Sequence, residues 1–183
     1  MKVELHSIVS LLLIPVLFLA TLPAISCTPN ETATAVKEIN VVLTQATNII
    51  AVADPNASWV PDLKAAVSAL QTSEAAWQSG GTVTQVINGL NTVESILVAI
   101  PETSQYAPLV VVVVAGIEAV LAILPLPTGV VYVKAVNPSN YYVVKARSLQ
   151  KELKPRWYET HADAFKRVWN KAVADSHLAT GKL

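Results

Sequence analysis

The chain lacks most of the residues by which an enzyme is recognised from its sequence. Cys27 is the one cysteine in 183 residues, so the chain cannot form an internal disulfide. It has no glycine-rich loop that would cradle a phosphate and no nucleophile elbow. His161 lies between Glu159 and Asp163, but it lacks the second nearby histidine of a usual zinc site. We therefore expect no catalytic site, no metal and no cofactor.

Charged residues are also scarce. They make up 14% of the chain, whereas apolar residues make up 52%, and the formal net charge is zero. Residues 28–127 nevertheless carry two basic and eight acidic residues, a net charge of −6. Residues 128–183 carry ten basic and four acidic residues, a net charge of +6. We therefore expect an acidic body, residues 27–127, followed by a basic C-terminal segment, residues 128–183.

Part of the apolar excess lies at the N-terminus, in a pattern typical of an export signal. Lys2 supplies a positive charge, residues 8–20 are apolar, and a short stretch ending in Ser26 leads directly to Cys27. We therefore predict that residues 1–26 are a signal peptide. Two other interpretations stay open. Cleavage could occur at an ordinary site near Cys27, or residues 8–25, which are barely long enough to span a membrane, could remain as an anchor.

An apolar run, then Ser26, then the chain's only cysteine resembles the lipobox of bacterial lipoproteins, over the first 27 residues. The resemblance implies that diacylglycerol is attached to the thiol of Cys27, that the peptide is cut before Cys27, and that the new N-terminus is usually acylated, for example with palmitate. Ala24 stands where the pattern prefers leucine. Thr28, in place of the aspartate that favours inner-membrane retention, implies an outer-membrane location facing the periplasm.

The acidic body shows the apolar spacing of amphipathic helices. Thr28, Pro29 and Glu31 are a helix-start signal, and the apolar stripe that follows runs to about residue 53. This stripe consists of Val36, Ile39, Val42, Leu43, Ala46, Ile49, Ile50 and Ala53. The fold therefore begins almost at Cys27, with little linker between them.

Two further amphipathic helices are predicted. One opens at Pro61 and ends before the glycine turn at residues 80–81. The next follows a capping box formed by Thr82 and Gln85, and it closes at Pro101. Because short loops favour antiparallel neighbours, the sequence predicts an all-α antiparallel bundle of about four helices with a C-terminal helical extension.

Residues 109–124 would form the fourth helix of this bundle. They are apolar on every side except for Glu118, so the segment must be buried in protein or in lipid. The segment is shorter than the roughly 20 residues that span a bilayer. We predict a core helix on which the amphipathic helices pack. A membrane-inserting helix and a buried strand, which the valines at 110–114 favour, are the alternatives.

Glu118 is the one charge in this apolar segment. On a helix its same-face neighbours are all apolar, and burying a carboxylate without a partner is costly. Either it lies at the edge of the bundle and reaches water, or it pairs with a lysine or arginine from the basic segment.

The basic segment offers two interpretations. Residues 130–136 are prone to form a strand, and residues 137–140 are a turn signal. Residues 141–147 are then either the second strand of a short β-hairpin or the start of a helix that runs to Leu153. We favour the helix because Ala146, Leu149 and Leu153 continue at helical spacing. A last helix is predicted after a cap at Thr160.

Lys166, Arg167 and Lys171 occupy the face of this last helix opposite its apolar stripe. Together with nearby aromatic residues, they are candidate contacts for an anionic ligand such as anionic lipid or cell-wall polymer. An ordinary solvated helix face is the simpler interpretation. We expect no nucleic-acid partner, because an exported protein seldom meets nucleic acid.

These patterns predict an exported, lipid-anchored protein with a non-enzymatic structural or interaction role in the cell envelope. Its partner would be a second copy of the chain or another envelope protein. Membrane insertion through residues 109–124, as in a pore or lysis protein, is one alternative. Binding of an anionic ligand or cell-wall polymer through the basic segment is the other.

Overall fold

The computed structural model describes residues 29–125, 141–153, 157–178 and 182–183, so Cys27 and residues 130–136 lie outside the described residues. The helices are α2 (Pro29–Ala53), α3 (Val60–Gln78), α4 (Val83–Val98), α5 (Ala107–Ile123), α6 (Tyr141–Leu153) and α7 (Trp157–Asp175). The described residues contain no strand. The prediction of an all-α helical bundle is confirmed.

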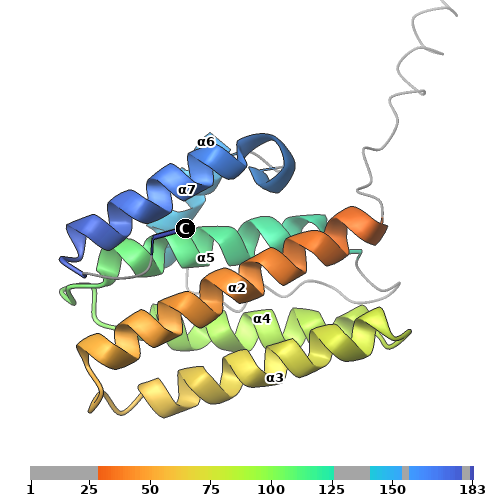
Figure 1. Cartoon of the computed structure of the whole chain (residues 1–183), viewed down its shortest axis with the longest axis horizontal. Helices are drawn as coiled ribbons and strands as arrows, with labels where there is room; N and C mark the ends of the chain where they lie inside the picture. Colours follow the sequence, from red (N-terminus) through yellow and green to blue (C-terminus); the bar gives the residue numbers. More distant parts are fainter. Residues whose placement is uncertain (1–28, 126–140, 154–156, 179–181) are drawn as a thin grey trace, which may run out of the picture.

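Helix α5 lies at the centre of the arrangement (Figure 1). It contacts α2 and α4 on one side and α6 and α7 on the other, while α3 packs against α2 and α4. Ile39 lies against Gly116, and Asp54 contacts Tyr106, so α2 and α5 run antiparallel. The segment predicted to form the core therefore does so, with helices from both halves of the chain packed around it.

Burial explains why the valine-rich segment is helical. Thirteen of the 17 residues of α5 are buried, including four of the five valines at 110–114. β-Branched residues weaken an isolated helix only slightly, and packing on several sides outweighs that preference. Gly116 allows α2 to approach closely, because a Cβ added there would lie 2.8 Å from Ile39 Cδ1. The strand alternative for residues 109–124 is wrong.

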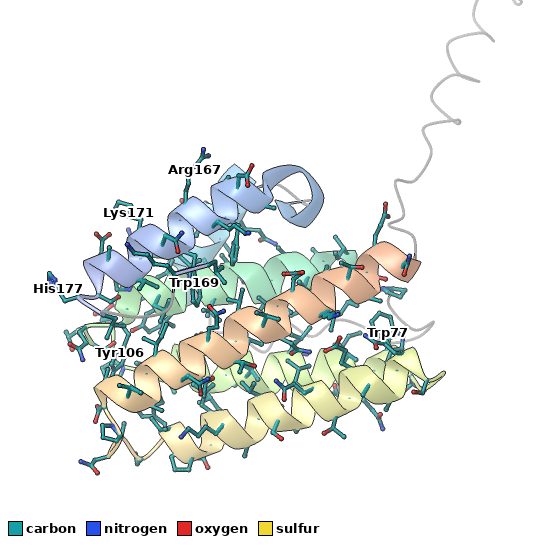
Figure 2. The ribbon with its side chains drawn as sticks, in the orientation of Figure 1. Trp77, Tyr106, Arg167, Trp169, Lys171 and His177 are labelled. Atoms are coloured by element: carbon teal, nitrogen blue, oxygen red, sulfur yellow. The ribbon has the colours of Figure 1, made fainter. Side chains whose placement is uncertain are left out.

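The C-terminal helices share the hydrophobic core of the acidic body. Tyr142 and Ala146 of α6 and Phe165 and Trp169 of α7 belong to the same buried cluster as α2–α5. Trp169 is fully buried on the side of α7 that faces α5 (Figure 2), with its ring centroid 6.4 Å from that of Phe165. Residues 141–147 are helical, as we favoured, so they are not the second strand of a hairpin.

Two helix starts differ from the prediction. Thr82 has the extended backbone of an N-cap, but its side chain makes no capping hydrogen bond. The hydrogen bond that the predicted capping box assigns to the Thr82 side chain is therefore not formed. α7 begins at Trp157 rather than after Thr160.

None of the helices in the described ranges is long and apolar enough to cross a membrane.

Candidate functional site

The structure places Glu118 on α5, where it is 3% exposed, and not at an edge of the bundle open to water. Arg147 of α6, in the basic segment, brings its Nε to 3.7 Å from Glu118 Oε1. This separation is longer than a usual hydrogen bond, so the two groups interact mainly through their charges. The pair links α6 to α5, with the Glu118 side chain buried and the Arg147 side chain 36% exposed.

The three cations predicted as ligand contacts do not form one cluster. Lys166, Arg167 and Lys171 are all exposed on α7. Lys166 lines a groove between α7 and α2, whereas Lys171 lines another groove between α5, α6 and α7. Arg167 points away from the bundle (Figure 2). The positive charges are therefore spread over both sides of the helix.

The groove between α5, α6 and α7 has a volume of about 390 Å³. Two cations line it, and both have partners within the chain. Lys171 Nζ lies 2.5 Å from Asp175 Oδ2, and Lys145 Nζ lies 6.0 Å from the ring centroid of Tyr141. An anionic ligand would have to compete with these contacts. The groove therefore gives little support to a specific anion site.

A polar contact that the sequence analysis missed joins α2 to α3. Glu74 of α3 is 9% exposed, and both of its carboxylate oxygens accept hydrogen bonds. Asn40 Nδ2 donates to Oε2 from α2, and Gln78 Nε2 donates to Oε1 at 2.9 Å. Glu74 lies in the apolar stripe between Leu70 and Trp77, and that position was a signal of burial. The contact fixes the register of the two helices.

An aromatic cluster lies at the end of the bundle where α2 finishes. Tyr106 Oη donates to Asp54 Oδ2 at 3.1 Å, and its ring packs edge-on against Trp59, with centroids 5.9 Å apart. Burial raises the pKa of Tyr106 to about 12, and the hydrogen bond to Asp54 acts in the same direction. Burial also raises the pKa of Tyr142, whose hydroxyl donates to the carbonyl oxygen of Pro101 at 2.7 Å.

The raised pKa of Tyr106 predicts a loss of stability at high pH. The unfolded chain loses this proton near pH 10 and the folded protein near pH 12, so the stabilisation is present below pH 10 and is lost as the pH rises through about 12. We expect Tyr106→Phe to lower the free energy of unfolding by about 1 kcal/mol at neutral pH. The difference from the parent should shrink above pH 10. Urea unfolding of both proteins across this range measures it, and a constant difference would contradict the assignment.

At the opposite end, α2 begins and α3 ends beside a groove of about 600 Å³. The described residues that line it are Asn30, Ala33, Thr34 and Lys37 of α2 and Trp77 and Gln78 of α3. Lys37 is exposed and is the one charged residue among them, and Trp77 is partly buried at this end of α3 (Figure 2). Cys27 precedes α2 by two positions, so the predicted lipid site is close to this groove along the chain.

Within the described part of the chain, no group of histidine, cysteine and acidic side chains could hold a metal ion, and the side chain of His161 is not described. No protein-family model, curated protein or solved structure matches the chain. The function is therefore inferred from the N-terminal pattern and from the arrangement of the bundle.

Proposed function

We propose that this chain is an exported protein of the bacterial cell envelope, held at a membrane by lipid on Cys27, with a non-enzymatic structural or interaction role. The main observation that supports the proposal is the position of the chain's only cysteine. Cys27 follows an apolar segment of signal type and precedes the first helix of the bundle by two residues. A thiol at that position has no disulfide partner in the chain, and acylation accounts for its presence.

Acyl chains on Cys27 would be sufficient to hold the bundle at a membrane. Each buried methylene contributes about 0.8 kcal/mol, and a single acyl chain gives only marginal, reversible binding. Diacylglycerol on the thiol supplies two chains, and an acyl group on the new N-terminus supplies a third. Anchoring of this kind is stable. Thr28 favours the outer membrane, with the bundle facing the periplasm.

The contacts of the buried carboxylates support a structural role for them. Glu74 accepts hydrogen bonds from Asn40 and Gln78, and Glu118 lies beside Arg147. Each contact links two helices or stabilises a helix end. These groups therefore contribute to packing, which is consistent with a protein that acts through its position and its surface.

Separation of cell extracts into membrane and soluble fractions tests the anchor. We expect the parent chain to remain with the membrane after washes with high salt and alkaline buffer, and to enter the detergent phase on phase separation. Cys27→Ala is expected to appear in the aqueous phase, because it lacks the acyl chains. Thr28→Ala, which keeps the thiol, is the matched control and should behave as the parent does. Retention of Cys27→Ala in the washed membrane would show that lipid on Cys27 is not the anchor.

A further inference from the structure

We propose that the groove between the start of α2 and the end of α3 lies in the headgroup layer of the membrane, where Lys37 and Trp77 contact phospholipid headgroups. The inference rests on the proposed lipid anchor at Cys27. It adds an orientation to that anchor. The bundle stands with this end on the bilayer, and the end that carries Trp59 and Tyr106 points away from it.

The length of the chain limits how far the groove can lie from the lipid. Asn30, which lines the groove, is three residues after Cys27. An extended chain spans at most about 3.6 Å per residue, so the two α-carbons lie no more than about 11 Å apart. The acyl chains of Cys27 enter the hydrocarbon core, and the headgroup layer of each leaflet is roughly 5–8 Å thick. The start of α2 therefore lies in this layer or directly above it.

The two side chains at the groove have the chemistry that headgroups attract. Lys37 is an exposed cation on a long flexible stem, which can reach the phosphates of anionic lipids. Trp77 combines an apolar ring with one N–H donor, and tryptophan is enriched at membrane interfaces for that reason. The two residues come from different helices, and the groove lies between them. Both groups therefore meet the same layer of lipid.

The outward face of α3 has few groups that would hold the bundle against the membrane along that side. Its exposed residues between the groove and the far end are Lys64, Ala65, Ser68, Ala69, Gln71, Thr72, Ala75 and Ala76. Lys64, near the far end, is the one cation among these side chains, and none of them is a large apolar group that would accompany it in the headgroup layer. Trp59, at the far end of α3, packs against Tyr106. The main competing orientation is contact through the exposed cations of α7, which would lift α3 away from the lipid.

Three exposed serines provide matched positions for a probe along α3. Ser79 follows the last residue of α3 beside the groove, Ser68 lies in the middle of α3, and Ser58 lies two residues before its start. Because α3 rises 1.5 Å per residue, the three positions are separated by roughly 15 Å along the helix axis. Because Cys27 carries the lipid, each of Ser79→Cys, Ser68→Cys and Ser58→Cys supplies a free thiol by a close isosteric change. Each acylated full-length protein is labelled with a small fluorophore. It is then reconstituted in phosphatidylcholine and phosphatidylglycerol vesicles that carry a nitroxide on the headgroup.

We expect strong quenching of the probe at Ser79→Cys, weak quenching at Ser68→Cys and none at Ser58→Cys. Equal quenching at all three positions, strongest quenching at Ser58→Cys, or none at Ser79→Cys would overturn the orientation. In each of these cases the protein would still float with the vesicles, so the proposed anchor would stand. A parent protein that fails to float would overturn the anchor and the orientation together.

A second set of variants tests the two assigned side chains. Lys37→Glu and Trp77→Ala, each introduced with Ser79→Cys, are expected to reduce quenching of the probe. Lys64→Glu, at an exposed lysine outside the groove, is the matched control for Lys37→Glu and should leave the quenching unchanged. Quenching that neither Lys37→Glu nor Trp77→Ala reduces would overturn the assignment of these residues as headgroup contacts.

Discussion

Replacing Trp169 with alanine is expected to lower the free energy of unfolding by about 3–5 kcal/mol. The side chain is fully buried beneath α7, with its ring 6.4 Å from that of Phe165. Its removal would leave a cavity in a core that relaxes only partly, so the loss of contacts adds to the loss of burial. An effect of this size would show that α7 is part of the core formed with α5.

Urea unfolding followed by circular dichroism measures this effect. Arg167→Ala, at an exposed position on the same helix, is the matched control and should change the stability by no more than about 0.5 kcal/mol. A single cooperative transition of the parent protein would show that α6 and α7 unfold together with α2–α5. Equal effects of Trp169→Ala and Arg167→Ala would mean that α7 does not contribute to the core as described.

Reversing the charge of Arg147 is expected to destabilise the protein by roughly 2 kcal/mol. Arg147→Glu would place a second carboxylate near Glu118, whose side chain is almost fully buried. The side chain at position 147 is 36% exposed, so water screens part of the repulsion between the two like charges. Arg147→Met removes the attraction but keeps an apolar stem of similar length, so its effect should be smaller. Lys145→Glu reverses an exposed charge on the same helix and should have little effect.

Equilibrium unfolding of these three variants at neutral pH gives the order of their effects. We expect Arg147→Glu to be the most destabilised, Arg147→Met intermediate and Lys145→Glu close to the parent. The difference between Arg147→Glu and Arg147→Met isolates the electrostatic part of the contact, because both variants lose the guanidinium group. Similar stabilities for these two variants would contradict a charge interaction with Glu118.

The helices could be predicted from the sequence because their apolar residues repeat with helical spacing. The stripe from Val36 to Ile50 and the apolar run around Glu118 each correspond to a helix in the structure. Helix starts were less predictable. Thr82 caps α4 with its backbone and not with its side chain, and α7 begins upstream of Thr160, because several nearby residues can begin a helix at similar cost.

Contacts between distant residues could not be predicted from spacing. Glu74 was visible in an apolar stripe, but its partner Asn40 is 34 positions away and meets it only through the packing of α2 on α3. A basic partner for Glu118 was one of two arrangements that the sequence predicted, but nothing in the spacing indicated that Arg147 would be that partner. The Lys171–Asp175 pair, by contrast, has the i,i+4 spacing of a helical ion pair and was predictable, although it was overlooked.

The two parts of the candidate site, Cys27 and the groove, also differ in whether the sequence alone could predict them. Cys27 is proposed from the sequence alone, because the pattern of an export signal is local. The groove between Lys37 and Trp77 required the fold, since 40 positions separate the two residues and only the antiparallel packing of α2 on α3 brings them to one end. The position of Cys27 two residues before α2 then connects the groove to the proposed lipid.

The mass of the intact protein, purified from its native membrane, tests the proposed lipid anchor most directly. We predict a mature chain that starts at Cys27 and carries the added mass of its acyl chains, together with a Cys27→Ala protein that lacks this added mass. An unmodified chain cut at another position, or an uncut chain of 183 residues, would contradict the proposal.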